Sequence, residues 1–412
     1  MKHMKKFLLR GFASFGFVVF LILCGFAIYL INVNPRENSK LSKKTNFSQE
    51  ELLRMRKVGL KSMITKKIKY NEKMVDRMYE KYLSNPRSTL DFLIISGGGE
   101  NASFGTGFLV GWSTVMDQNF SMPLFDGVVG VSAGSLIAPF AYIGTSQSLE
   151  FVDNLFRHPQ SSFVRSTSPF PFLPGNQSLL AIPGLEKAIH GAFTEALAKK
   201  IVQSTSQGRL LLIQATNLDL AIPGIFDFVE IAKESLETKN SNSMINVVLA
   251  SSAIPGVFPP REIDGYTFVD GAVESNIYYG GHPSLPSRTF GGAWKKKYPE
   301  IPIPTIRLWV IVNGNLREAP NNHFSDWISV ALRSLAVSEG ANQVAALREL
   351  YSFAELSKSR GLGNVEVRWV SIESTLKGSS FPHLFDKKLM IELSDLGRRL
   401  GSNPYSWNTK EP

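Results

Sequence analysis

The sequence is poor in the residues that would cross-link it or bind a metal ion through sulfur. Its 412 residues include a single cysteine, Cys24, so no disulfide can form within one chain and a metal site built on several cysteines is excluded. Internal repeats and low-complexity tracts are also lacking. Because 43% of the residues are hydrophobic and only 19% are charged, we expect a folded body with a large core.

Acidic residues are scarce at the amino-terminal end. Residues 1–90 hold 19 Lys or Arg against six Asp or Glu, whereas residues 91–412 hold 26 against 29. The basic surplus therefore belongs to the first part of the chain and not to the folded body. A nucleic-acid-binding protein would need a basic face on its body, so we predict no nucleic acid as partner and favour attraction of the amino-terminal part to an anionic membrane surface.

Residues 11–33 are 23 in number and carry no charge. At ~1.5 Å rise per residue, a helix of this length crosses the ~30 Å hydrocarbon core of a bilayer. A cleaved signal peptide has a shorter apolar core of ~7–15 residues and a small-residue cleavage site, which is missing here. Lipid attachment at Cys24 would need a small residue before it, and Leu23 stands there.

We therefore predict a single-pass membrane anchor over residues 1–33, in a bacterial inner membrane. Basic residues flank the apolar run on both sides, which leaves its orientation open by the charge rule. The short amino-terminal tail favours an exported body.

Residues 34–88 are predicted to form a linker and a basic amphipathic helix. From Ser48 to Leu83, apolar residues such as Leu60, Val75 and Met78 recur mostly at three- and four-residue steps, opposite Lys and Arg. Two interpretations remain: the apolar face packs on the body, or the basic helix lies on lipid.

The remaining pattern alternates strands with helices. We expect strands at residues 90–95, 125–129, 210–215, 266–269, 306–312 and 365–372, and helices at 102–115, 136–143, 185–204, 244–252, 387–400 and, as more than one helix, between 326 and 358. A loop at 163–174 is interpreted either as a wall of an acyl pocket or as cover for the core. The run from Trp294 to Tyr298, with three lysines, is interpreted as a solvated loop or a lipid contact.

The best candidate nucleophile is Ser132. It lies at the centre of Gly130-Val131-Ser132-Ala133-Gly134, between an apolar run and a helix-like segment. A strand that turns sharply into a helix at a serine exposes the hydroxyl, and small residues on either side allow the tight backbone. An ordinary strand-to-helix turn is the alternative interpretation of this pattern.

A glycine cluster about thirty residues earlier strengthens the interpretation. Gly97, Gly98 and Gly99 follow a predicted strand, where consecutive amides can point at an anion that forms during a reaction. A phosphate-binding loop would need Gly-Lys-Ser/Thr or Gly-x-Gly-x-x-Gly, and neither is present. We predict an oxyanion hole.

A candidate base ends a later strand. Asp270 is followed by Gly271 and Ala272, at a position from which a carboxylate can approach Ser132 across the edge of the sheet.

From about Thr89 onward the chain resembles the patatin-like phospholipases. The resemblance rests on the glycine cluster, the Ser132 pentapeptide and Asp270-Gly271-Ala272, with support from residues 215–219 and 251–259. It implies a three-layer α/β/α hydrolase domain over residues 89–412, a Ser132–Asp270 dyad without histidine, and an oxyanion hole of the Gly97, Gly98 and Gly99 amides.

The activity that the resemblance implies is lipid acyl hydrolysis of the phospholipase A or lysophospholipase type. A membrane phospholipid or another lipid ester would form an acyl-serine intermediate that water hydrolyses, with no cofactor and no metal ion. Many relatives carry a basic residue and then a glycine after the triple glycine, whereas this chain has Asn101 and Ala102. This difference leaves the head-group preference open.

Three alternatives remain. An α/β-hydrolase esterase with a Ser-Asp-His triad would recruit one of His282, His323 and His383. A lipid acyltransferase would use an alcohol in place of water. An inactive, membrane-anchored lipid-binding protein would keep the fold without turnover.

Overall fold

A computed structural model describes residues 47–117, 119–160, 163–167, 176–205, 208–279, 288–320, 322, 326–372 and 384–412. Its centre is an eight-stranded mixed sheet in the order β10-β9-β1-β2-β5-β8-β7, with β6 also paired to β5. The strands are β1 (Leu90–Ile95), β2 (Gly127–Val131), β5 (Leu210–Asn217), β6 (Ile222–Asp227), β7 (Arg261–Ile263), β8 (Tyr266–Asp270), β9 (Ile306–Val312) and β10 (Val365–Ser371). A separate two-stranded ribbon joins β3 (Arg165–Ser166) to β4 (Leu180–Ala181).

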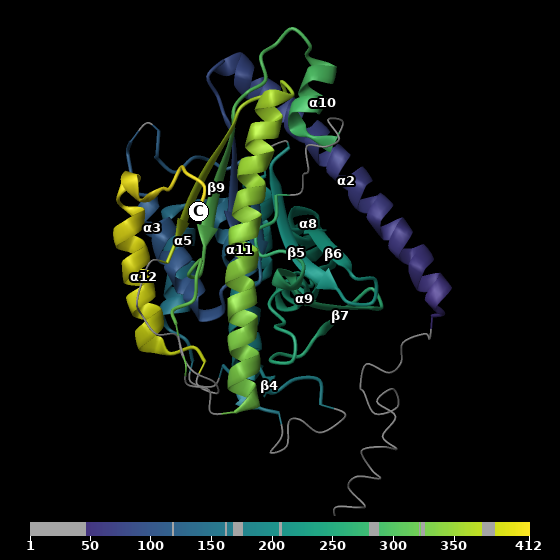
Figure 1. The fold of residues 1–412 in the computed structure, drawn as a ribbon, viewed down its shortest axis with the longest axis vertical. Helices are drawn as coiled ribbons and strands as arrows, with labels where there is room; N and C mark the ends of the chain where they lie inside the picture. Colours follow the sequence, from purple (N-terminus) through teal and green to yellow (C-terminus); the bar gives the residue numbers. More distant parts are fainter. Residues whose placement is uncertain are drawn as a thin grey trace, which may run out of the picture.

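Helices cover both faces of this sheet (Figure 1). One face carries α3 (Ser103–Trp112), α4 (Ala133–Ile143), α5 (Ser146–Arg157), α6 (Pro183–Ala192), α7 (Glu195–Gln203), α8 (Phe228–Thr238), α9 (Asn242–Ser251) and α12 (Lys387–Gly401). The other carries α2 (Gln49–Ser84), α10 (Phe290–Lys297) and α11 (Trp327–Ser359). The mixed α/β fold with a helix-covered sheet is as predicted.

Coverage on both faces explains why the central strands are almost wholly apolar. In β1, Leu93 and Ile95 enter the core on the α3 side, whereas Phe92 and Ile94 enter the core on the α2 side. Five strands, β10, β9, β1, β2 and β5, run parallel, and parallel strands need such double coverage. Their carboxyl ends therefore meet at one edge of the sheet.

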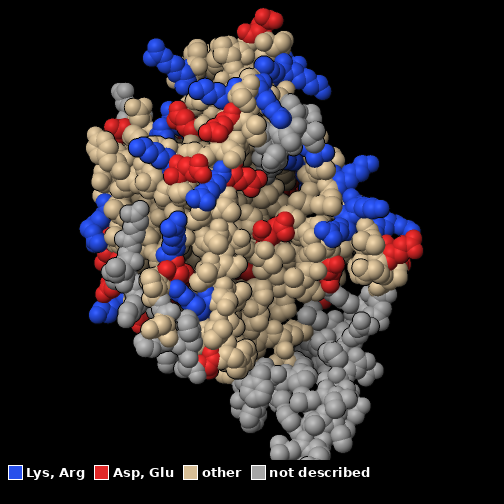
Figure 2. All heavy atoms as spheres, viewed as in Figure 1, with Lys and Arg blue, Asp and Glu red and all other residues tan. Residues whose placement is uncertain are grey.

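The long helix α2 has fully buried side chains only in its carboxyl-terminal half, although Gly59 in the other half also lies against Ile222 of β6. Ser48 caps it in a reciprocal box with Glu51, and Val75 and Met78 are buried as the pattern predicts, but Leu60 is 40% exposed. In Figure 1 its amino-terminal end extends away from the sheet, and Figure 2 shows basic side chains gathered along it at the right of the view. In the part of the chain that the structure describes, no helix has the length and apolarity to cross a membrane; the predicted anchor at 1–33 lies outside that part.

Three predictions of elements were wrong. The helix expected at 185–204 is two helices, α6 and α7, which meet near Phe193. The segment between 326 and 358 is one helix, α11. Residues 294–298 are not a loop: they lie in and directly after α10, and Trp294 is fully buried, with its indole N–H bonded to the Ile301 carbonyl at 3.1 Å. The lipid contact at the three lysines stays a prediction.

Candidate active site

The register of three strands carries Ser132 and Asp270 to the same level of the sheet. In the parallel pair of β2 and β5, Val131 lies opposite Gln214. In the antiparallel pair of β5 and β8, the next residue, Ala215, lies opposite Asp270. Ser132 follows Val131 directly, so the two ladders place the serine and the carboxylate at the same edge although 138 residues separate them.

The two side chains are in direct contact. Ser132 Oγ donates a hydrogen bond to Asp270 Oδ2 at 2.6 Å, and both residues are buried. Burial raises the pKa of Asp270 to about 7, while hydrogen bonds from Ser132 and from the Ala272 amide act in the opposite direction. A carboxyl group with such a pKa can take up and release a proton near neutral pH.

Ser132 occupies a strained backbone conformation. Its φ of 53° and ψ of −128° lie where few residues other than glycine are found, at the turn from β2 into α4. Ser251 Oγ accepts from the Ser132 amide at 2.9 Å, and Ser252 Oγ donates to the Ser132 carbonyl at 3.1 Å. These two side chains of α9 and its carboxyl-terminal cap hold the turn in place.

Glycine is required at Gly134 by close approach. A Cβ atom there would overlap the carbonyl oxygen of Ile95, because the first turn of α4 lies directly on the end of β1. The glycine cluster follows this end of β1, so the contact brings the cluster beside the serine. Gly130, before the turn, is restricted in the same way, because a Cβ atom on it would overlap the carbonyl oxygen of Gly134.

The glycine cluster divides into one occupied amide and two open ones. The Gly97 amide donates to Asn276 Oδ1 at 2.6 Å, whereas the Gly98 and Gly99 amides have no partner among the described residues. Gly98 has a φ of 149°, and a Cβ atom on it would overlap the carbonyl oxygen of Asn313. The sequence assigns all three amides to an oxyanion hole; the geometry leaves Gly98 and Gly99 available for that role.

Sequence reasoning missed a polar chain behind the cluster. Asn276 accepts from Gly97 and donates from Nδ2 to Glu339 Oε1 at 2.7 Å, and burial raises the pKa of Glu339. Asn276 lies five residues after Gly271, on the far side of the short 3₁₀ turn that Asp270 caps through the Ala272 amide. Its position shortly after Asp270-Gly271-Ala272 was the available signal.

An apolar cavity of about 430 Å³ opens at the serine. Ser132 and Gly99 line one end, and most of the wall is aromatic and aliphatic: Leu136, Phe140, Phe151, Leu155, Phe156, Phe163, Leu185, Ile189, Phe193, Ile254, Phe258, Phe385 and Met390. We call it the acyl cavity. Phe163, from the loop at 163–174, contributes to it as one of the two interpretations predicts, while residues 168–175 lie outside the described part.

Glu100 joins the glycine cluster to the wall of the acyl cavity. Its carboxylate accepts hydrogen bonds from the amides of Phe385 at 2.7 Å and Asp386 at 3.2 Å. The Phe385 ring in turn meets Phe163 edge-on, with ring centroids 5.5 Å apart. The segment before α12 therefore belongs to the site although it is remote from it in sequence.

The three histidines of the alternative triad, His282, His323 and His383, lie outside the described residues. His158, which directly follows α5, is described and lines the acyl cavity, and its Nδ1 lies 3.0 Å from the Asn154 carbonyl of that helix. Among the described residues, no three His, Cys, Asp or Glu side chains gather in a way that would hold a metal ion.

Residues 93–279 match the family model of the patatin-like phospholipases. This stretch is a patatin-like phospholipase domain. It contains the glycine cluster, Ser132 and Asp270, and it implies a hydrolase that acts on lipid esters. The crystal structure of VipD from Legionella pneumophila aligns with 78% of this chain and 68% of its own, at 12% identity and a TM-score of 0.35. No curated protein matches the chain.

Proposed function

We propose that the protein is a lipid acyl hydrolase of the phospholipase A or lysophospholipase type that works through a Ser132–Asp270 dyad. The observation that carries the proposal is the 2.6 Å hydrogen bond from Ser132 Oγ to Asp270 Oδ2 at the end of an apolar cavity. Direct contact between hydroxyl and carboxylate leaves no room for an intervening imidazole, which favours a dyad over a triad.

In the proposed reaction, Asp270 takes the Ser132 proton as Oγ attacks the ester carbonyl carbon. The Gly98 and Gly99 amides stabilise the tetrahedral oxyanion. When the C–O bond breaks, the proton passes from Asp270 to the departing lysolipid alcohol, and an acyl-serine remains. Water then attacks the acyl carbon and gives its proton to Asp270; collapse of the second intermediate returns a proton to Ser132 and releases the fatty acid.

The acyl cavity supports a long-chain substrate. Its wall is almost entirely apolar, while the charged side chain of Lys187 and the His158 ring contribute among the few polar groups. Such a wall favours an acyl chain over a sugar or peptide, since apolar contact would hold the chain without directional bonds. We further propose that the segment 1–33 anchors the enzyme in a membrane, where phospholipids are its substrates.

The test is hydrolysis of phosphatidylcholine and lysophosphatidylcholine in mixed micelles by the full-length chain, beside Ser132→Ala and Asp270→Asn. We expect both variants to lose about 10³-fold or more in kcat, as when the nucleophile or base of acyl transfer is removed. Ser148→Ala, a buried serine of α5 outside the acyl cavity, is the matched control and should keep its turnover.

An active Asp270→Asn variant would contradict the dyad and favour the alternative Ser-Asp-His triad. A folded parent without turnover on these lipids would favour a binding protein. A competing alcohol that receives the acyl group in place of water would identify an acyltransferase.

A further inference from the structure

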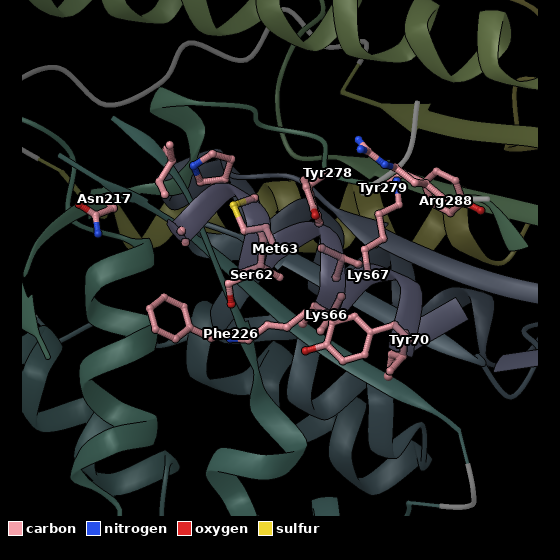
Figure 3. Close-up of a pocket in the computed structure, with 18 of the residues that line it drawn as sticks. Ser62, Met63, Lys66, Lys67, Tyr70, Asn217, Phe226, Tyr278, Tyr279 and Arg288 are labelled. Carbon is pink, nitrogen blue, oxygen red and sulfur yellow. The ribbon is translucent and has the colours of Figure 1, made fainter. Parts of the chain in front are cut away.

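A second cavity lies on the opposite face of the sheet from the acyl cavity. It is enclosed by α2, strands β5 and β6, and residues 278–279 and 288–290 (Figure 3), and it shares no lining residue with the acyl cavity. We call it the α2 cavity. Its volume of about 380 Å³ falls in the range of small-molecule sites. The proposed hydrolysis makes no use of it.

The floor of the α2 cavity is apolar. Phe92, Val129 and Leu212 project from the sheet, and Phe226 and Phe353 also line the cavity. Contact with such a surface lowers the free energy of a hydrocarbon chain relative to water. The floor therefore favours a ligand with an apolar chain.

One end of the α2 cavity is cationic. Figure 3 shows Lys67 and Arg288 on the same side of the cavity as Tyr279, whereas Phe226 lies toward the other side. Burial, and after it the nearby charge of Arg288, lowers the pKa of Lys67 to about 8. No described carboxylate offsets this repulsion, although Asp264 lies elsewhere in the lining.

Two like charges in a partly buried site are unfavourable unless an anion joins them. An anion between Lys67 and Arg288 would receive charge-assisted hydrogen bonds from both. The Arg288 backbone is already held, because Asn71 Nδ2 of α2 donates to its carbonyl at 3.0 Å. The cationic end is thus fixed to the same helix that carries Lys67.

We propose that the α2 cavity binds a single-chain amphiphile with an anionic head group, its head between Lys67 and Arg288 and its chain along the apolar floor. Two sources share this chemistry, a free fatty acid and a lysolipid that ends in a phosphate monoester. The proposal concerns binding alone and does not depend on turnover at Ser132.

The test uses the full-length Ser132→Ala chain in phosphatidylcholine nanodiscs, so that no hydrolysis intervenes. A dodecanoate with a photoreactive diazirine in its chain is cross-linked, and the adducts are mapped by mass spectrometry. We expect adducts on α2 near Met63 and on β6 near Phe226, suppressed by excess palmitate. The alcohol analogue should label these positions at least about tenfold less, since it lacks the charge that the two cations bind.

Dodecyl phosphate with the same diazirine separates the two sources. Stronger labelling by the phosphate assigns the site to a lysolipid, and stronger labelling by the carboxylate assigns it to a fatty acid. Equal labelling by the alcohol, or adducts confined to the acyl cavity or the nanodisc scaffold, would overturn the proposal.

Lys67→Met should weaken labelling of the α2 cavity by about ten- to a hundredfold. Lys61→Met, at an exposed position of the same helix outside the lining, is the matched control and should leave it unchanged. Thermal melting of both variants monitors folding, and the adduct map of the chain with Lys67 intact tests the site independently. Undiminished labelling of folded Lys67→Met would refute the role of the cationic end.

Discussion

In the proposed dyad, Asp270 must be ionised to accept the proton of Ser132, and its burial makes ionisation costly. Because its pKa is raised to about 7, the base is increasingly protonated as the pH falls below neutrality. We expect kcat/KM to rise with pH through about 7 and to level off above it, which a pH–rate profile on a soluble ester would measure. An acid limb near the ordinary pKa of aspartate would contradict the assignment of Asp270 as a buried base.

Substitution of Glu339 should shift the acid limb of the pH–rate profile. The negative charge of Glu339 adds to the rise in the pKa of Asp270, so Glu339→Gln should shift the acid limb of the pH–rate profile to lower pH, while the amide keeps an oxygen for Asn276. Glu349→Gln, at an exposed position of the same helix, should leave the limb in place. A purely structural role of Glu339 would lower the rate without moving the profile.

Helices α3 and α12 pack so closely that glycine is needed where they cross. A Cβ atom on Gly397 would overlap the Phe104 carbonyl. We expect Gly397→Ala to destabilise the fold by about 1–3 kcal/mol, as overpacking does.

The control is Gly191→Ala in α6. A Cβ atom there meets no neighbouring atom, so this variant should be neutral or stabilising by about 0.5–1 kcal/mol, because alanine favours a helix. Thermal or denaturant melting of the pair measures the difference; equal stability would show that the helices can move apart.

How far the sequence predicts each element depends on how local its cause is. The bounds of β1 and β9 follow from short apolar runs that predict strands without any knowledge of their neighbours in the fold. The helix α10 was missed because Gly291 and Gly292 argue against a helix, and burial of Trp294 against α2 outweighs that propensity. Asn276 was missed for a similar reason, since its partner Gly97 lies 179 residues away.

The fold depends on residues far beyond the matched family domain. β9 pairs with β1 on the side opposite β2, and α12 packs against α3, so two elements of the domain 93–279 have partners from the last third of the chain. A fragment of residues 47–279 should therefore fail to fold, whereas residues 47–412 should unfold cooperatively. Circular dichroism during thermal melting distinguishes the two, and a cooperative melt of the shorter fragment would show that the domain is autonomous.

The β2–β5 and β5–β8 strand pairs also make the distance between Ser132 and Asp270 depend on whether this part of the sheet stays folded. The proposed nucleophile follows β2 and the proposed base ends β8, two strands that are not paired with each other. Among the described strands, β8 is bordered on its outer side by β7, which is three residues long. Fraying that begins at this border would draw the carboxylate away from the hydroxyl while the parallel strands stayed intact. Catalytic turnover would then fade on warming before the bulk of the molecule melts, and the enzyme would act as the earliest reporter of its own unfolding.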